Sequence, residues 1–456
     1  MLIAGAGPTG LTLAVDLARR GARVRIIDRA ASHFVGSRGK GLQERSLEVL
    51  ADLGVADQLR AAGWALPTRV STRGRPVREL PPAATLILPQ SIVEETLRAR
   101  LAELGVTVEL DTTLTGFEQS ADRVVATTSR GSIAARYLVG CDGGRSTVRK
   151  TLGVAFTGES SAGKSMVLGD VEVTGLSREY GHIWIDPQRG MLALTPFRTV
   201  PQWQFQAATP DAGEPSLAEF RRQFDLFTGL RDVTISKPTW LSTYRVSARM
   251  TQEYRVGRVF LAGDAAHVHP PAGGLGMNTG IQDAYNLGWK LARTLAGTAS
   301  PELLDTYRQE RVPIAEWTLN TSSTGLEQLW TAVTSGTGAI ETVNKPEHRQ
   351  LGLGYRDGPL SKNLTTWDGP EAGDRAPWLQ EIGGGGFTLL GFGTAADSLS
   401  GVRDVTTRPM PGEQDVLVLV RPDGYIAMVA GPADVKPVQD YIDRPWSATH
   451  QERDGL

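Results

Sequence analysis

Two glycine-rich segments of the chain carry the residue types that bind a dinucleotide. The first runs Gly5-Ala6-Gly7-Pro8-Thr9-Gly10 and stands between an apolar strand and an amphipathic helix. In such a turn, one glycine allows the tight bend, one lets a pyrophosphate approach the backbone, and one lets helix and strand pack closely. Asp28 ends the returning strand, 18 residues beyond Gly10, where a carboxylate can bind ribose hydroxyls. The alternative for Asp28 is a solvated strand end.

The second segment begins at Gly263-Asp264-Ala265-Ala266-His267 and continues through a Pro/Gly-rich loop to Asn278. An apolar strand at 258–262 precedes it, and the pattern from Met277 to Leu295 predicts a helix. The loop and the helix N-terminus can present bare N–H groups to an electron-rich ring edge. The two distant segments together predict one FAD site. The alternative is that Asp264 is a helix cap and that His267 and His269 are structural.

Three cations, Arg38, Lys40 and Arg45, surround two glycines at the start of a predicted helix. They are candidates to neutralise a pyrophosphate or to recruit a nicotinamide cofactor, and the alternative is a solvated helix start. Asp142-Gly143, followed by Arg145 and Ser146, is a further candidate that can also be only a turn with a helix cap.

The composition bounds the class of protein. The chain has 456 residues and a net charge of -2, which gives no electrostatic case for nucleic acid. No apolar run approaches the roughly 20 residues that span a bilayer, and the N-terminus lacks the features of a signal peptide, so we expect a cytoplasmic protein. Cys141 is the only cysteine, which fits a reducing compartment, excludes an internal disulfide and a multi-cysteine metal site, and favours a small buried residue at a strand end. We expect no metal.

The order of elements predicts a mixed α/β protein with a Rossmann-like FAD-binding domain, an inserted antiparallel-sheet substrate domain and a C-terminal domain. Helices are expected at 43–59 and 90–104, and short β runs replace helical faces between 166 and 244. The expected FAD-binding domain covers 1–165 and 245–300, the substrate domain 166–244, a helical linker 301–344, and the C-terminal domain 345–456.

The motifs in order carry a family resemblance. They are Gly5-X-Gly-X-X-Gly10, Arg38 to Ser46, Leu88-Pro89-Gln90, Tyr137 to Ser146, and Gly263 to His267 with Gly273 to Gly280. The chain resembles the single-component (class A) FAD-dependent aromatic hydroxylases with the para-hydroxybenzoate hydroxylase fold. Within them it most resembles the bacterial aromatic polyketide hydroxylases and the rifampicin monooxygenases, and the resemblance covers essentially the whole chain.

The resemblance implies roles for particular residues. Asp264 would bind the ribityl chain of non-covalent FAD, Met277 and Asn278 would offer backbone N–H groups to the flavin, Gln90 would contact FAD, and Asp142-Gly143 would lie beside the pyrophosphate. The full set of expected cofactor residues is Gly5, Gly7, Pro8, Thr9, Gly10, Asp28, Arg29, Arg38, Lys40, Gln90, Asp142, Gly143, Asp264, Pro271, Gly274, Gly276, Met277 and Asn278. The C-terminal region resembles the thioredoxin-like appendage of these enzymes, but the missing cysteine pair excludes a dithiol role.

The implied activity is hydroxylation of a phenolic, polycyclic polyketide-type aromatic through a C4a-hydroperoxyflavin, with O2 and with NADPH or NADH as transient electron donor. No catalytic side chain is named, and we expect a monomer or homodimer. Only one Gly-X-Gly-X-X-Gly occurs, so no separate nicotinamide-binding Rossmann domain is expected. Two alternatives stay open: Baeyer–Villiger oxygenation of a polyketide on the same fold, and a flavin-binding sequestration or sensor protein without turnover.

The substrate pocket is expected between the flavin and the 166–244 sheet. Trp203 and Phe205 share one face of a predicted strand by period two and are candidates to line it. The other candidates are Trp184, Met191, Phe197, Tyr244 and Pro271. The alternative for each of these aromatic and apolar residues is a place in the core of the sheet.

Overall fold

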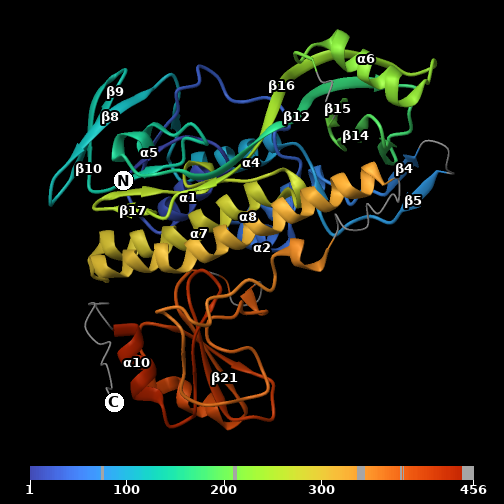
Figure 1. Ribbon diagram of the computed structural model, residues 1–456. Coiled ribbons are helices and arrows are strands. Elements are labelled where there is room, and N and C mark those ends of the chain that lie inside the picture. Colours follow the sequence, from blue (N-terminus) through green and yellow to red (C-terminus); the bar gives the residue numbers. More distant parts are fainter. Residues whose placement is uncertain (73–76, 209–212, 336–344, 380–382, 384, 444–456) are drawn as a thin grey trace, which may run out of the picture.

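The structure is a computed structural model that describes residues 1–72, 77–208, 213–335, 345–379, 383 and 385–443; the side chains of 160–165 and 244–246 are also outside the description. Three large β-sheets, of six, eight and five strands, are arranged around a central pair of long helices (Figure 1). In the described ranges, no helix combines the length and the apolar character needed to cross a membrane.

The first sheet has six strands in the order β17-β18-β11-β1-β2-β7. All its neighbours are parallel except β17 and β18, and its inner strands are apolar because both faces are covered. The bounds are β1 Leu2–Ala4, β2 Arg25–Ile27, β7 Val108–Glu109, β11 Leu138–Gly140, β17 Arg255–Val256 and β18 Val259–Leu261. The motifs at Gly5 and Gly263 follow β1 and β18, so parallel strands bring both to the same sheet edge.

Short helices and two small sheets surround this first sheet. A three-stranded sheet of β8 to β10 and a two-stranded pair of β3 and β6 lie beside it. The bounds are α1 Pro8–Arg19, β3 Gly41–Leu42, α2 Glu44–Asp52, α3 Ala56–Ala62, β6 Leu86–Ile87, α4 Gln90–Glu103, β8 Leu114–Gln119, β9 Val124–Thr128, β10 Gly131–Ala135 and α5 Thr147–Leu152. The single helix expected at 43–59 is wrong: it is two helices, because Gly54 takes a left-handed conformation at φ 80°.

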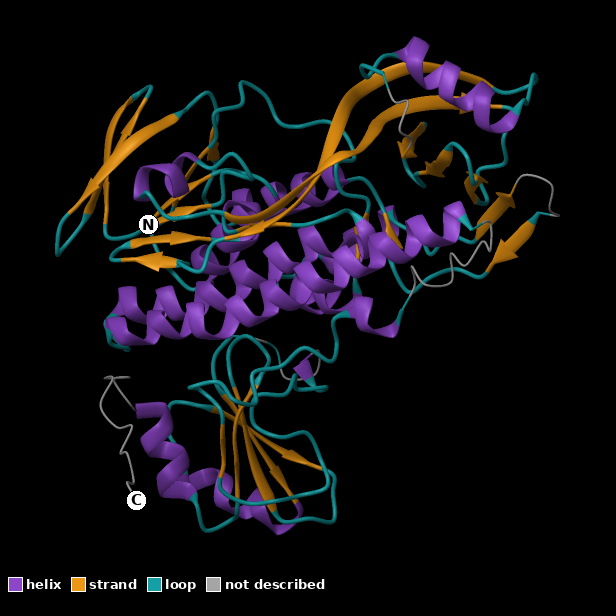
Figure 2. Cartoon of the chain, in the orientation of Figure 1, coloured by secondary structure: helices purple, strands orange, loops and turns teal. Residues whose placement is uncertain are grey.

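The second sheet has eight strands in the order β19-β16-β12-β15-β14-β13-β4-β5, antiparallel except where β13 meets β4. The bounds are β4 Thr68–Thr72, β5 Arg78–Leu80, β12 Thr157–Thr174, β13 Gly181–Asp186, β14 Gly190–Pro196, β15 Gln202–Ala208, β16 Thr234–Met250 and β19 His267–Val268. The sheet therefore extends beyond the expected 166–244. It recruits β4 and β5 from the N-terminal part of the chain, and β12 and β16 continue past both limits as one long ribbon (Figure 2).

A helix that the sequence pattern did not predict, α6 Leu217–Thr228, covers one face of this sheet (Figure 1). Its Phe220 and Phe224 enter a buried cluster with side chains of β12, β14 and β15. One face of the sheet is thereby sealed, and only the opposite face is left to line a cavity.

The helices α7 Leu275–Ala296 and α8 Asp305–Thr334 lie side by side across the middle of the molecule (Figure 2). On the side away from the second sheet they meet a five-stranded sheet in the order β20-β24-β23-β21-β22. Its bounds are β20 Lys362–Asn363, β21 Thr388–Phe392, β22 Thr406–Met410, β23 Val416–Val420 and β24 Ile426–Ala430, followed by α10 Val435–Asp443. A buried ion pair between Glu310 of α8 and Arg421 ties this sheet to the helices.

Candidate functional site

A cavity of about 1740 Å³ extends from the edge of the first sheet to the open face of the second. Residues of both glycine-rich segments line it together. The expected cofactor residues on its wall are Gly5, Gly7, Pro8, Thr9, Asp28, Arg29, Arg38, Lys40, Gln90, Asp142, Gly143, Asp264, Pro271, Gly274, Gly276 and Met277. Gly10 and Asn278 are fully or nearly buried behind this wall.

The glycines at the start of α1 differ in what surrounds them. A Cβ on Gly5 would lie 2.2 Å from the Cys141 carbonyl oxygen, and a Cβ on Gly10 would lie 2.0 Å from the Gly5 carbonyl oxygen. A Cβ on Gly7 would meet nothing within 4 Å. Gly5 and Gly10 therefore permit close packing, while Gly7 leaves the helix N-terminus open to the cavity, which is the geometry that a pyrophosphate needs.

Asp28 lies at the end of β2 and lines the cavity. Its carboxylate accepts hydrogen bonds from the backbone N–H groups of Ala6, at 2.7 Å, and Ala30, at 2.9 Å. It is therefore more than a solvated strand end, because it fixes the loop that carries the first glycine motif.

Asp142 combines two of the expected functions. Its Oδ2 accepts hydrogen bonds from Thr147 N, at 2.6 Å, and Val148 N, at 3.2 Å, in the first turn of α5, whose N-cap residue is Ser146. Its Oδ1 is buried and has no hydrogen-bond partner among the described residues. The turn with a helix cap, the alternative stated for this segment, is therefore present. Oδ1 of Asp142 remains available as an acceptor beside the cavity.

Asp264 presents its carboxylate to the cavity and has no hydrogen-bond partner in the described part of the chain. It belongs to a short 3-10 turn, Gly263–Ala265, and the residue that caps α7 is Gly274. Desolvation by the surrounding protein raises the pKa of Asp264, and the charges of His267 and Arg38 oppose this shift. Asp264 is therefore not a cap of α7, and its oxygens are free to accept hydroxyl groups.

The N-terminus of α7 forms another part of the wall through Gly274, Gly276 and Met277. The side chain of Asn278 points away from it. It accepts a hydrogen bond from Gln43 N at 2.8 Å and donates to the carbonyl oxygens of Gly41, at 3.0 Å, and Gly274, at 2.7 Å. Asn278 therefore fixes the start of α7 against the segment that precedes α2.

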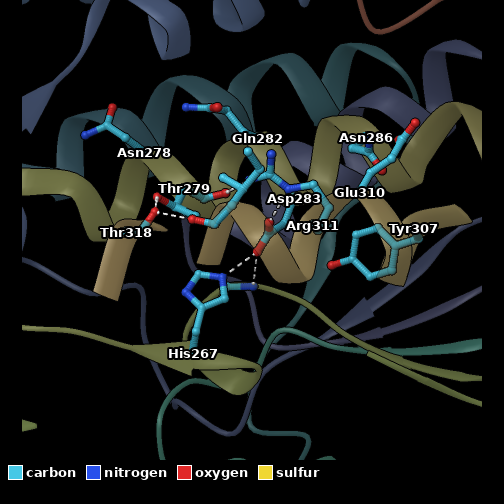
Figure 3. Close-up of polar contacts among 12 residues, drawn as sticks. His267, Asn278, Thr279, Gln282, Asp283, Asn286, Tyr307, Glu310, Arg311 and Thr318 are labelled. Carbon is cyan, nitrogen blue, oxygen red and sulfur yellow. Dashed lines mark hydrogen bonds and ion pairs between the residues drawn. The ribbon is translucent and has the colours of Figure 1, made fainter. Parts of the chain in front are cut away.

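A buried ionic cluster supports the loop after β18 from behind (Figure 3). Asp283 of α7 accepts hydrogen bonds from Gly263 N, at 3.0 Å, and Arg311 Nε, at 2.7 Å, and its Oδ2 lies 2.7 Å from His267 Nε2. Burial lowers the pKa of the neighbouring His269 to about 3, assisted by His267, so His269 is neutral. His267 is thus held within the ionic cluster, whereas the neutral His269 lines the cavity.

The Gln90 side chain is engaged by the protein. Its Oε1 accepts a hydrogen bond from Gly39 N at 3.1 Å, and its Nε2 donates to Glu94 Oε1 at 2.8 Å. Desolvation raises the pKa of Glu94 to about 7, although the hydrogen bond from Gln90 lowers it. Gln90 thus lines the cavity and also positions the Gly39 loop, a function that the sequence did not predict.

The three candidate cations go to three different places. Arg38 is exposed on the cavity wall, with its guanidinium 4.4 Å from the ring centre of Phe34. Lys40 reaches the second sheet. Arg45 is buried and donates to Glu48 and to the Asp423 carbonyl oxygen, so it holds the C-terminal sheet. Arg38 is the one of the three whose position suits a cofactor phosphate.

The prediction that Trp203 and Phe205 line the pocket is wrong. Both are fully buried on the face of β15 that α6 covers, and the Phe205 ring stacks on Phe220 with centres 4.2 Å apart. The intervening residues Gln204 and Gln206 line the cavity instead. The two residues do share one face of the strand, as predicted. That face is covered by α6, a helix that the sequence analysis did not predict, so it cannot line the cavity.

The remaining substrate candidates divide between wall and core. Met191 and Pro271 line the cavity. Trp184 packs on Phe224 within the α6 cluster, with ring centres 5.7 Å apart, and Phe197 is buried away from the wall, so both predictions are wrong. Tyr244 is in β16, and its side chain lies outside the described residues.

The wall provided by the second sheet changes from an apolar row at one end, through a mixed row of Ala193, Gln206 and Leu168, to a polar row at the other end. Cross-strand neighbours set this order, because Met191, Ala208 and Met166 form one row and Thr195, Gln204 and Asp170 form another. The apolar residues of this wall include Met166, Leu168, Ile183, Met191, Ala193 and Trp240, and α8 adds Leu326 and Leu329. In the described ranges, no group of three or more His, Cys, Asp or Glu side chains is arranged to hold a metal ion.

These observations fit FAD. The open helix N-terminus at Gly7 suits a pyrophosphate, the free oxygens of Asp142 and Asp264 suit hydroxyl groups, and the start of α7 suits the ring edge. The site is thus that of a flavoprotein with a second chamber lined by both apolar and polar side chains of the second sheet.

Comparisons with known proteins agree with this class. Residues 1–322 match the family described as FAD binding domain, and the chain belongs to that family. It is 39% identical to a flavin-dependent monooxygenase of Mycobacteroides abscessus, over 97% of this chain and 99% of the relative. It is 41% identical to the 6-methylpretetramide 4-monooxygenase of Streptomyces rimosus, over 79% and 71%.

A solved structure shares the arrangement of the chain. The ternary complex of aklavinone-11 hydroxylase with FAD and aklavinone aligns with a TM-score of 0.83 at 25% identity, over 98% of both chains. The predicted enzyme class, an FAD-dependent monooxygenase, and the resemblance to polyketide hydroxylases are confirmed.

Proposed function

We propose that the enzyme uses NAD(P)H and O2 to hydroxylate a phenolic, polycyclic, polyketide-type aromatic. The observation that carries this proposal is the continuity of the cavity, in which the wall around Asp264 and Met277 passes directly into the apolar wall around Leu168 and Met191. A flat hydrophobic substrate would therefore reach the start of α7. The names of the relatives support the same substrate class, since one acts on 6-methylpretetramide and another binds aklavinone.

The residues divide the work by position. Gly7 and Arg38 would hold the FAD pyrophosphate, Asp264 the ribityl hydroxyls, and the N–H groups at Gly276 and Met277 the ring edge, where the helix N-terminus stabilises negative charge. Bound FAD would supply hydride acceptance from NAD(P)H and the activation of O2. The apolar wall would keep water from the reacting atoms and orient the substrate ring.

The strand order of the C-terminal sheet supports the expected thioredoxin-like domain. Strands β21 and β22 are parallel, β23 is antiparallel to β21, and β24 is antiparallel to β23, in the spatial order β22-β21-β23-β24. Because Cys141 is the only cysteine of the chain, this domain has no dithiol chemistry. We assign it the structural function of covering α7 and α8.

The test begins with the cofactor. Flavin released by heat from the purified protein is expected to be FAD by chromatography, and FMN would contradict the proposal. NADPH or NADH is then added under nitrogen, with and without a polycyclic phenol. A phenol that accelerates flavin bleaching and, in air, gains one oxygen atom by mass spectrometry supports hydroxylation. A ring-expanded ester product would instead indicate a Baeyer–Villiger reaction, and no bleaching at all would indicate a sequestration protein.

A further inference from the structure

Lys40 is placed where it can touch the substrate. It stands between Gly39 and Gly41, and its side chain crosses to the second sheet, where Nζ lies 3.0 Å from Thr195 Oγ1 and 3.4 Å from Gln206 Oε1. All three residues line the cavity at the polar end of the sheet wall. This end belongs to the substrate chamber, because the neighbouring wall residues of β14 are Ala193 and Met191.

The ammonium group of Lys40 is incompletely satisfied. It carries three N–H donors, and the described residues provide two acceptors, both of them neutral oxygens. Against the larger effect of burial, the negative charge of Asp170 on β12 raises the pKa of Lys40. One oxygen of Asp170, however, already accepts a hydrogen bond from the Ser37 hydroxyl. A half-buried cation with a spare donor at a cavity wall is a site for an anionic oxygen.

The charge state agrees with this geometry. Burial lowers the pKa of Lys40 to about 8, while Asp170 opposes the shift, so most of the group is still protonated at pH 7. Burial also raises the pKa of Asp170 to about 6, although the Ser37 hydroxyl and the Lys40 charge lower it. Asp170 is thereby a poorer counter-ion than a surface carboxylate, and an anionic ligand would stabilise the cationic form of Lys40.

We propose that Lys40 determines substrate specificity by binding an acidic oxygen of the polycyclic substrate, a phenolate or an enolate, through its Nζ. This inference rests on the proposed function and replaces the expected contact of Lys40 with the cofactor. Thr195 and Gln206 are positioning residues that hold Nζ at the wall. The substrate binds with its ionised edge toward Lys40 and its apolar rings along Leu168 and Met191.

The test uses the FAD-loaded enzyme and two probes, 1,2-dihydroxyanthraquinone and its 1,2-dimethoxy ether. The visible spectrum of the dihydroxy compound changes on ionisation, and the ether cannot ionise. The wild-type enzyme is expected to bind the dihydroxy compound as its anion at a pH where the free compound is neutral. Lys40→Met should abolish this spectral change and weaken binding about tenfold or more, the value of a lost charge-assisted hydrogen bond. The affinity for the ether should stay within about twofold.

Lys237→Met is the matched control, because Lys237 is an exposed lysine of the same sheet that pairs with Glu172 outside the cavity. It should keep the wild-type spectrum, and Lys40→Arg should retain the preference for the anion. Melting temperature and FAD content are measured for every variant, and Lys40→Gln serves if Lys40→Met does not fold.

Two results would overturn this inference and leave the proposed function intact. One is an unchanged ionised fraction of bound probe in Lys40→Met. The other is a loss of FAD in that variant, which would mean that Lys40 binds the cofactor instead. If the wild-type enzyme bound neither probe, the polycyclic substrate class of the proposed function would fail, and this inference with it. Failure of the enzyme to oxidise NADPH while the anion preference persists would contradict only the proposed function.

Discussion

Thr9 and Gly263 are packed so tightly that a Cβ on Gly263 would lie 2.5 Å from Thr9 Oγ1. Thr9 belongs to the first glycine motif and Gly263 begins the second, and the two are far apart in the sequence. A Cβ on Gly280 of α7 would likewise lie only 2.3 Å from the same oxygen. The side chain of Thr9 therefore joins the two halves of the expected FAD site, and small residues opposite it are a condition for that contact.

Replacing Gly263 with alanine should destabilise the enzyme and reduce its FAD content. Gly263 has a left-handed backbone at φ 58°, which costs an L-residue roughly 1–2 kcal/mol, and the contact with Thr9 adds about 1–3 kcal/mol of overpacking. Gly297→Ala is the control, because its φ is 76° but a Cβ there meets nothing within 4 Å. Thermal unfolding should show the larger loss for Gly263→Ala. Equal losses would mean that the Thr9 contact carries no energy.

Asp264→Ala should weaken FAD binding by about 1.5–3 kcal/mol, the value of a hydrogen bond involving a charged group. The fold should survive, because the carboxylate has no hydrogen-bond partner among the described residues that the change would orphan. Titration of the apoprotein with FAD measures the effect, and the melting temperature of the apoprotein serves as the control. Wild-type affinity in the variant would remove Asp264 from the cofactor site.

Most residues expected around the cofactor do line the cavity, whereas among the described substrate candidates only Met191 and Pro271 do. Gly5 and Gly10 can be recognised in the sequence because the close backbone packing at these positions admits no other residue type. A strand pattern, by contrast, shows which side chains share a face and not which face is open. For β15 that choice depends on α6, whose presence reverses the assignment of Trp203 and Phe205.

The signal for α6 was nevertheless present in the sequence. Ser216 and Glu219 have the spacing of a capping box, and the Ser216 hydroxyl accepts a hydrogen bond from Glu219 N at 3.1 Å. Phe220 and Phe224 follow on one helical face, and Gly229 ends the helix at φ 64°. The position of Lys40 had no such signal, because a cluster of cations near two glycines does not reveal which side chain crosses to another sheet.

Phe205→Ala and Trp203→Ala should each cost about 3–5 kcal/mol of stability, the usual value for deleting a buried aromatic side chain. The folded fraction should keep the wild-type yield of H2O2 per NADPH consumed, because neither residue lines the cavity. Met191→Ala is the comparison, since Met191 does line it and its loss should raise the peroxide yield by admitting water. Peroxide assays and melting curves on the three variants distinguish core residues from residues that line the cavity. A raised peroxide yield for Phe205→Ala would place that residue back at the substrate.

The buried ionic cluster between α8 and the C-terminal sheet should make the docking of that sheet depend on Arg421. Arg421 donates hydrogen bonds to Glu310 and Asp423, and Lys290 Nζ lies 2.7 Å from Glu310. Arg421→Met leaves two buried carboxylates with less compensation, which should cost about 3–5 kcal/mol and produce an early unfolding transition. Arg356→Met is the control, because its pair with Asp374 is exposed and should be worth less than about 1 kcal/mol.

The same cluster gives this destabilisation a defined pH dependence. Burial alone raises the pKa of Glu310, but the charges of Arg421 and Lys290 outweigh it and hold the pKa below its usual value. The stability that Glu310 provides is therefore present above its unfolded pKa of about 4.3 and is lost as the pH falls through the lower folded value. In Arg421→Met, Glu310 takes up its proton at a higher pH, which relieves the uncompensated charge. The difference in melting temperature between wild type and variant should be largest at pH 6–8 and shrink toward roughly pH 4. A difference that is constant over this range, or equal to that of Arg356→Met, would show that the cluster does not hold the sheet in place.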